Sequence, residues 1–233
     1  MDLNGAKALV TGGSEGIGRA IAEALAREGS DVVITARRRE LLEATAGELG
    51  VDWICGDVGR EEDAVRTVRE FVDRHGRIDI LINNAGFGIF AELVETDLAQ
   101  LSEVYRTNVY GAFLMAREAA RHFVRQESGH LVNISSTAGT KGFRGGTAYA
   151  SSKFALKGMT ECWRDELRRH NVRVILVNPS EVVTPFATKA GYEQDASPRK
   201  LRPQEIADAV LGALKMDDRG FLPEFSVFAT NPF

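Results

Sequence analysis

The chain has 233 residues, of which 44% are hydrophobic and 27% are charged, and its formal net charge is −4. These values are typical of a soluble globular protein with a single domain, here residues 1–233, and the acidic balance argues against nucleic acid as a partner. The sequence shows no signal peptide and no apolar run of about 20 residues, so we expect a cytoplasmic protein without a membrane contact. Cys55 and Cys162 do not have the spacing of a metal site or a redox pair, so we expect no metal.

Apolar runs rich in β-branched residues alternate along the chain with segments whose apolar residues recur at helical spacing. The runs predict strands buried on both faces of a parallel sheet, and the segments predict the helices between them. In chain order we expect strand Ala6–Val10, helix Gly18–Glu28, strand Asp31–Ala36, helix Leu41–Leu49, strand Asp52–Cys55, helix Glu61–His75, strand Asp79–Ile82, helix Leu98–Gln126, strand His130–Ile134, helix Tyr149–His170, strand Val172–Val177, helix Pro203–Leu214 and strand Glu224–Ala229. Strict alternation predicts the α/β class, with a doubly wound parallel sheet and helices on both faces.

A glycine-rich loop, VTGGSEGIG, covers residues 10–18, directly after the first predicted strand. Gly12 would allow a tight turn, and Gly16 and Gly18 would let the backbone approach a pyrophosphate and let the helix pack close to the sheet. The N-terminus of that helix offers free N–H groups to phosphates. The loop therefore predicts a dinucleotide site, although a purely structural turn is the alternative.

Two further helical features indicate chemistry. Tyr149 and Lys153 are four residues apart, so their side chains share one helix face, and an ammonium there would lower the phenol pKa from its usual value of about 10. A tyrosine and a lysine at this spacing are common on helices, and most such pairs have only a structural role. Asn108 falls inside a long predicted helix, where a buried amide is unfavourable unless it forms hydrogen bonds.

The segment Thr184–Arg202 is the longest stretch without clear periodicity, and it contains Pro185, Gly191 and Pro198. A loop of this length in a compact domain is typical of a lid or a substrate-binding loop. A partly disordered surface loop is the alternative.

Several motifs occur in a characteristic order between residue 6 and about residue 185. They are Thr11–Gly18 as TGxxxGxG, Asn83-Asn84-Ala85-Gly86 as NNAG, Asn108, Ser136, Tyr149 and Lys153 as YxxxK, and Asn178-Pro179 with Val182-Val183-Thr184 as NPGxVxT, in which Ser180 replaces the usual glycine. Taken together, this set resembles the short-chain dehydrogenase/reductase family, in particular 3-oxoacyl-[acyl-carrier-protein] reductase-like members. The resemblance implies a Rossmann domain with a seven-stranded sheet in the order 3-2-1-4-5-6-7.

The resemblance also implies the roles of individual residues. Tyr149 would exchange a proton with the substrate, Ser136 would hold the carbonyl oxygen, Lys153 would assist Tyr149, and Asn108 would hold a water that links the lysine to solvent. The expected cofactor-binding residues are Gly12, Ser14, Glu15, Gly16, Ile17, Gly18, Arg37, Arg38, Asp57, Val58, Asn84, Ala85, Gly86, Tyr149, Lys153, Pro179, Val182 and Thr184. The expected substrate-binding residues are Ser136, Phe143, Tyr149 and Phe186, with Phe87, Phe90 and Tyr192 as further candidates for the pocket wall.

The end of the second strand bears on the choice of cofactor. NAD-preferring members of the fold carry an acid there, whereas this chain has Ala36 followed by Arg37 and Arg38, and arginine suits a 2′-phosphate. Glu15 argues the other way because an acid close to that phosphate would repel it. We therefore expect NADP(H), with NAD(H) as the alternative.

The expected substrate is a ketone, an aldehyde or a 3-oxoacyl thioester on acyl carrier protein. Arginines that could provide a basic patch for such a carrier are Arg121, Arg125, Arg164, Arg168 and Arg169. In the family the helices Leu98–Gln126 and Tyr149–His170 form subunit contacts, which implies a homodimer or homotetramer. A catalytically silent dinucleotide-binding regulatory protein is the alternative from another class, and an epimerase or dehydratase is a second enzymatic one.

Overall fold

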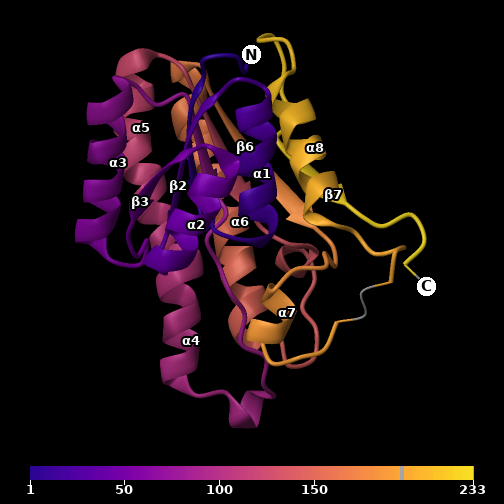
Figure 1. Cartoon of the computed structure of the whole chain (residues 1–233). Helices are drawn as coiled ribbons and strands as arrows, with labels where there is room; N and C mark the ends of the chain where they lie inside the picture. The colour runs from indigo at the N-terminus through magenta and orange to yellow at the C-terminus, as the bar shows by residue number, and fades with distance from the viewer. Residues whose placement is uncertain (195–196, 233) are drawn as a thin grey trace.

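The protein is described by a computed structural model, and the structure describes residues 1–194 and 197–232. Within these residues seven parallel strands form one sheet in the order β3-β2-β1-β4-β5-β6-β7 (Figure 1). The strands are β1 (Lys7–Thr11), β2 (Asp31–Ala36), β3 (Asp52–Cys55), β4 (Ile80–Asn83), β5 (Gly129–Ile134), β6 (Val172–Pro179) and β7 (Glu224–Val227). The expected fold class and strand order are confirmed.

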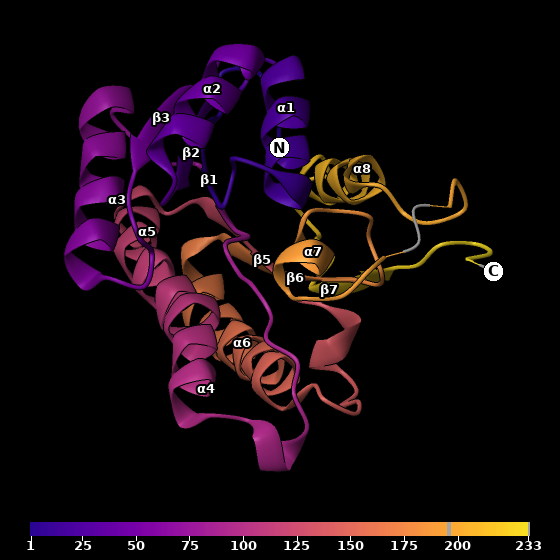
Figure 2. The same cartoon turned by 60° about the horizontal axis from the view of Figure 1, so that its bottom comes forward.

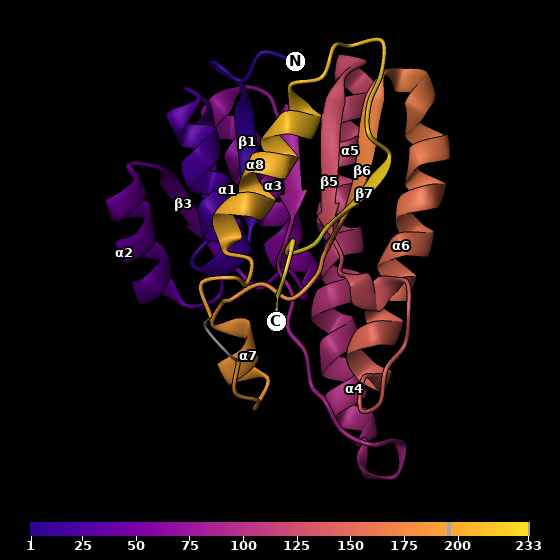
Figure 3. The ribbon, with the colours of Figure 1, turned by 90° about the vertical axis from the view of Figure 1, so that its right-hand side faces the viewer.

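Helices cover both faces of this sheet. The helices are α1 (Gly16–Arg27), α2 (Arg39–Leu49), α3 (Glu61–His75), α4 (Leu98–Tyr105), α5 (Ala112–Gln126), α6 (Thr147–Leu167), α7 (Phe186–Lys189) and α8 (Pro203–Leu214). Figure 3 shows α1 and α8 on one side of the strands and α5 and α6 on the other. Neighbouring residues of a strand point to opposite faces, so Val10 packs with α1 and α8 while Leu9 packs with α3 and α5.

The long helix expected over Leu98–Gln126 is interrupted. A π-helical turn, Arg106–Gly111, lies between α4 and α5 and contains Asn108. A π turn accommodates one extra residue in a helix and is frequent at functional sites.

The loop Thr184–Arg202 contains the short helix α7, and Figure 2 shows α7 over the carboxyl end of the sheet. The two ends of the loop lie together because Val183 N donates to Leu201 O at 2.8 Å. The last strand is shorter than expected and ends at Val227. None of the helices in the described ranges is long and apolar enough to cross a membrane.

The winding of the chain reverses between β1 and β4, which are neighbours in the sheet. Ala8 pairs with Ile80 and Val10 with Ile82. Beyond the last pair, Thr11 Oγ1 accepts hydrogen bonds from the backbone N–H groups of Asn84 and Ala85, both at 3.0 Å. In open α/β sheets the crevice at such a reversal is where ligands bind.

Candidate active site

A cleft of about 1340 Å³ opens at the carboxyl ends of the strands, over the reversal between β1 and β4. Its walls come from the β1–α1 loop, the ends of β2, β3, β4 and β5, the start of α6 and the segment after β6. The expected site residues that line it are Gly12, Ser14, Glu15, Gly16, Ile17, Arg37, Arg38, Asp57, Val58, Asn84, Ala85, Gly86, Ser136, Phe143, Tyr149, Lys153, Pro179, Val182, Thr184 and Phe186. The structure thus brings together residues that the sequence spreads over more than 170 positions.

Gly18 and Asn108 do not line the cleft, and both lie behind its wall. Gly18 is buried, and a Cβ atom there would collide with the Asn84 side-chain nitrogen and with the carbonyl oxygen of Gly12. Gly18 therefore allows α1 to pack tightly against the loop, which agrees with its expected packing role, and its contact with the cofactor stays a prediction.

The glycine loop leaves the start of α1 open to the cleft. Gly12 and Gly16 adopt φ values of +64° and +57°, a left-handed conformation that favours glycine. Glu15 precedes the helix without capping it through its side chain, and the first turn of α1 holds no acidic residue. The first N–H groups of the helix remain available to an anion, so the cradle fits a dinucleotide pyrophosphate.

Glu15 is engaged by two cations. Its Oε2 atom lies 2.8 Å from Arg38 Nη2, and its Oε1 atom pairs with Lys189 of α7. Arg37 instead lies over the ring of Phe87, with 6.0 Å between the guanidinium carbon and the ring centroid. Lys189 also lines the cleft and was not identified from the sequence, in which it is 174 residues away from Glu15.

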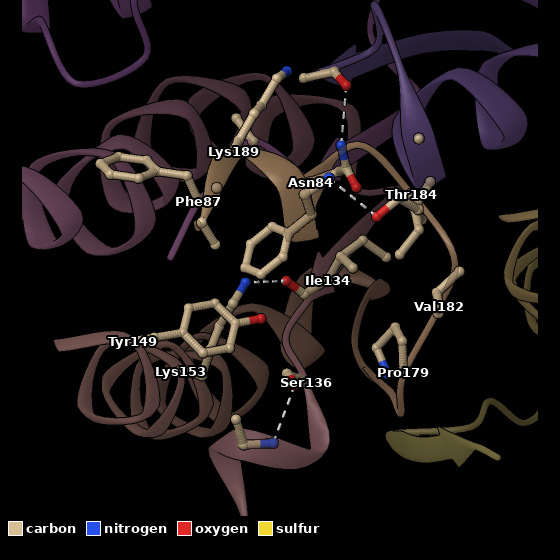
Figure 4. Close-up of a pocket in the computed structure, with 18 of the residues that line it drawn as sticks. Asn84, Phe87, Ile134, Ser136, Tyr149, Lys153, Pro179, Val182, Thr184 and Lys189 are labelled. Carbon is tan, nitrogen blue, oxygen red and sulfur yellow. Dashed lines mark hydrogen bonds between the residues drawn. The ribbon is translucent and has the colours of Figure 1, made fainter. Parts of the chain in front are cut away.

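Tyr149 and Lys153 meet on the first turns of α6, as their spacing predicts. Lys153 Nζ lies 5.7 Å from the centroid of the Tyr149 ring and donates to the carbonyl oxygen of Ile134 at 2.9 Å (Figure 4). Ser136 follows β5, lines the cleft and accepts from Ala138 N at 3.1 Å through its Oγ atom, and its hydroxyl group is close enough to Tyr149 to lower the pKa of the phenol. The neighbouring Ser135 is buried and donates to the backbone of Lys153, so Ser136 is the serine that faces Tyr149.

Burial dominates the proton affinity of both groups. It raises the pKa of Tyr149 to about 12, while the hydrogen bond with Ser136 acts in the opposite direction. Burial also lowers the pKa of Lys153 to about 8. In the protein chain by itself, burial therefore outweighs any effect of the Lys153 ammonium on the Tyr149 pKa. The physical reason is that desolvation disfavours the charged form of either group, and the lysine is bonded to a carbonyl oxygen rather than to the phenol.

Asn108 is almost fully buried and all of its hydrogen-bonding groups are used. Its Oδ1 atom accepts from Phe87 N at 3.0 Å, and its Nδ2 atom donates to Phe87 O at 2.9 Å and to Ser152 Oγ at 3.0 Å. A Cβ atom at Gly86 would lie 3.1 Å from Asn108 Oδ1 and 3.6 Å from Lys153 Nζ. Asn108 thus supports the wall beside Lys153 from behind, and the prediction that it needs hydrogen-bond partners is confirmed.

Two other expected cofactor residues are also held by the protein itself. Asp57 Oδ2 accepts from Arg106 at 3.1 Å, and its Oδ1 atom accepts from Gly59 N at 3.0 Å. Asn84 Nδ2 donates to the carbonyl oxygens of Thr11 at 2.9 Å and Gly12 at 3.2 Å. These bonds fix the ends of β3 and β4, so both side chains shape the cleft even before a ligand enters.

The segment after β6 departs from the family motif at Ser180. This residue lines the cleft, and its backbone N–H donates to Val227 O at 2.9 Å, which continues the pairing with β7. Sequence reasoning also missed Phe228, which reaches the cleft from the C-terminal tail. A lone aromatic residue in an apolar tail carries no signal for such a role.

Known proteins resemble this chain in sequence and in structure. A family model described as short chain dehydrogenase matches residues 6–195. A human 3-oxoacyl-[acyl-carrier-protein] reductase is 37% identical over 177 residues, which cover 75% of each chain. An uncharacterized oxidoreductase, YxnA, of Bacillus subtilis is 34% identical over 91% of this chain, and the match spans 63% of that protein's length. The X-ray structure of an alcohol dehydrogenase from Thermococcus sibiricus, complexed with 5-hydroxy-NADP, superposes with a TM-score of 0.88 at 28% identity and covers 96% of each chain.

Proposed function

Because the chain belongs to the short chain dehydrogenase family, we propose that it is an NADP(H)-dependent oxidoreductase that interconverts a carbonyl compound and its alcohol. The observation that carries this proposal is the convergence of Tyr149, Ser136 and Lys153 at one end of a cleft whose other end holds the open start of α1. The candidate substrates are ketones, aldehydes and 3-oxoacyl thioesters.

The chain's own residues provide the proton chemistry. Bound NADPH would supply a hydride to the carbonyl carbon and become NADP⁺, so the carbonyl oxygen has to gain one proton. Tyr149 donates that proton from its hydroxyl group, and Ser136 donates a hydrogen bond that orients the same oxygen. The phenol of Tyr149 is protonated at neutral pH, as a general acid in the reducing direction has to be.

Lys153 and Asn108 act around Tyr149. The Lys153 ammonium lies beside the phenol and would stabilise the phenolate after the proton has left, and it would also hold the cofactor ribose. Asn108 bonds the Phe87 backbone and Ser152 and does not line the cleft, which supports a positioning role for it.

Two arginines at the end of β2 support NADP(H) over NAD(H). Arg37 and Arg38 line the cleft directly after β2, where no acid follows the strand, and they would hold a 2′-phosphate. The solved alcohol dehydrogenase described above is complexed with 5-hydroxy-NADP, which also supports this preference. Comparison of kcat/KM for NADPH and NADH tests it, and a clear preference for NADH would contradict it.

The variant Tyr149→Phe tests the assignment of the acid. It should lower kcat for carbonyl reduction by about 10²-fold or more, because the proton donor is lost, while NADPH still binds. Binding is measured by the change in NADPH fluorescence. Tyr105→Phe, on α4 away from the cleft, is the matched control and should retain full activity. Activity of Tyr149→Phe close to that of the wild type would refute the mechanism.

A catalytically silent regulatory protein on the same fold is the competing proposal, although no feature of the site favours it. It would bind NADPH but oxidise it with none of a panel of ketones, aldehydes, diketones and 3-oxoacyl thioesters. Such a screen therefore separates the two functions.

A further inference from the structure

We propose that the carbonyl substrate carries an aromatic ring, that this ring packs against an aromatic cluster centred on Phe90, and that the substrate is a free small molecule rather than a carrier-bound acyl chain. This inference rests on the function proposed above and narrows its substrate class. It is carried by the arrangement of the rings and by the position of the cationic residues.

Phe90 lies at the centre of the cluster and contacts four other rings. Its ring centroid is 5.6 Å from those of Tyr149 and Tyr192, at interplanar angles of 73° and 70°. The centroids of Phe143 and Phe186 lie at 5.8 Å and 6.3 Å. These are edge-to-face and tilted arrangements, the geometries that aromatic pairs favour. An additional ring would find the same kind of partner here.

The proposed acid belongs to this cluster. Tyr149 packs against Phe90 and also against Phe186, with 5.3 Å between the centroids of Tyr149 and Phe186. A carbonyl group that accepts a proton from Tyr149 must therefore lie next to these two rings. The part of the substrate attached to that carbonyl then lies within the aromatic wall.

The backbone makes room for the rings at two glycines. A Cβ atom at Gly88 would lie 2.9 Å from ring atoms of both Phe186 and Phe90, and one at Gly146 would lie 2.8 Å from the ring of Phe143. The rings of Phe90, Phe143 and Phe186 thus pack directly against the backbone at these glycines. The rings come from four separate segments, namely the stretch after β4, the loop before α6, α6 itself and the loop around α7. They are brought together by the tertiary fold and not by proximity in the sequence.

Aromatic side chains also line the mouth of the cleft. Phe143, Tyr192 and Phe228 all line the cleft, and they are 50%, 41% and 65% exposed. Large apolar side chains gathered in this way at the opening of a cleft mark a ligand-binding surface. A flat apolar substrate is the occupant that would cover them.

The position of the cations argues against a carrier protein as partner. Arg164 follows Tyr149 on α6 by 15 residues, which places it about 22 Å along the helix from the reacting end, and Arg168 lies just beyond the end of α6. Arg164 is bonded to the carbonyl oxygens of Val174 and Pro223, near the opposite end of the sheet. Arg121 is near the end of α5 and is paired with Glu118. These arginines therefore form no basic patch at the cleft mouth, where an acidic carrier would dock most directly.

The cations near the cleft mouth are mostly balanced by acids. Lys189 is paired with Glu15, and Lys200 with Glu181. Lys141 lines the cleft as well, but one lysine is not a basic patch.

Phenylacetone and cyclohexylacetone provide the test. A methylene group separates ring and carbonyl in both ketones, so the intrinsic reactivity is matched and only the ring differs. We expect kcat/KM for phenylacetone, measured as NADPH oxidation, to exceed that for cyclohexylacetone by about tenfold, since the substrate ring gains several aromatic contacts. A 3-oxoacyl thioester should be turned over less efficiently than phenylacetone.

Two variants assign this preference to the cluster. Phe90→Leu keeps an apolar side chain but removes the central ring, so the ratio of the two kcat/KM values should fall towards one. Phe143→Leu removes a half-exposed ring at the mouth, where folding is not at stake, and should lower the ratio about threefold. Phe113→Leu, on the outer face of α5, is the control and should leave the ratio unchanged.

The outcomes separate the two levels of the proposal. A ratio near one in the wild type, an unchanged ratio in both cluster variants, or a preferred 3-oxoacyl thioester would overturn the aromatic inference and leave the oxidoreductase function intact. Binding of NADPH without its oxidation by any carbonyl compound would overturn the proposed function, and this inference with it.

Discussion

At the scale of single residues, the buried Lys153 predicts the pH dependence of the reaction. Its pKa is lowered to about 8, whereas the pKa of Tyr149 is raised to about 12, so Tyr149 keeps its proton over the range in which Lys153 loses its charge. We expect kcat/KM for NADPH-dependent reduction to be constant below pH 8 and to fall above it, since the free enzyme then lacks the ammonium. A pH profile from 6 to 10 measures this.

Lys189 offers the control for that profile, because burial lowers its pKa as well. Lys189→Arg keeps a positive charge at every pH in the range and should leave the alkaline decrease near pH 8 in place. If the decrease disappears in this variant, it belongs to Lys189 and not to Lys153.

Glu15 predicts a change in cofactor affinity. It holds Arg38 at 2.8 Å, so the guanidinium is partly neutralised where a 2′-phosphate would bind. Glu15→Gln should lower the Kd for NADPH by about threefold to tenfold, a modest gain because the pair is half-exposed, and should leave the Kd for NADH nearly unchanged. Fluorescence titration with both cofactors measures this. Glu48→Gln, which breaks an ion pair with Arg19 outside the cleft, is the control. An unchanged or weaker affinity for NADPH would contradict the prediction.

At the scale of elements, two helical glycines should respond in opposite ways to alanine. Gly18→Ala places a methyl group against the Gly12 carbonyl and the Asn84 amide, and we expect the free energy of unfolding to fall by about 3 kcal/mol. Gly47 of α2 is exposed and has no atom within 4 Å of an added Cβ, so Gly47→Ala should raise that free energy by about 0.5–1 kcal/mol. Urea unfolding of both variants tests the pair, and equal effects would contradict the packing role of Gly18.

The sequence predicted most strands and helices to within a residue or two. The expected bounds Glu61–His75 and Pro203–Leu214 agree with the structure because local chemistry marks them. The first begins with three acidic residues and ends before Gly76 in a left-handed conformation, and the second begins with a proline at its first position. Strands buried on both faces appear as apolar runs, so they were also visible.

Other features of the structure have no local pattern in the sequence that would predict them. The π turn Arg106–Gly111 adds one residue to a helix without changing its apolar character, and α7 has only four residues, too few for a period to show. The pairing of Glu15 with Lys189 and the raised pKa of Tyr149 both arise from tertiary packing. The motif residues of the cleft and most of the rings in its wall were predictable, whereas Lys189 with its pairing to Glu15, and Phe228, were not.

At the scale of the whole molecule, exposed aromatic side chains predict self-association. Tyr110, Phe113 and Phe154 are 56%, 40% and 45% exposed, and they belong to the π turn, α5 and α6, on the side of the sheet away from α1 and α8. We expect a dimer or tetramer in sedimentation velocity, and a shift to monomer when Phe113 and Phe154 are both replaced by glutamate. Val94→Glu changes a residue that is 92% exposed in the short 3-10 turn Leu93–Glu95 before α4 and serves as the control. A monomeric wild type would contradict the prediction.

The reversal of the chain between β1 and β4 also has a consequence for the order of events in folding. β4 must pair with a strand some 70 residues earlier, Ala8 with Ile80, while every strand is parallel to its neighbour and none is joined to it by a hairpin. Such long-range pairing is slow because a large loop has to close first. The cleft spans the line where β1 and β4 meet, so no ligand can bind across it before that pairing has formed. A cofactor can therefore stabilise the assembled sheet but cannot guide the chain toward it.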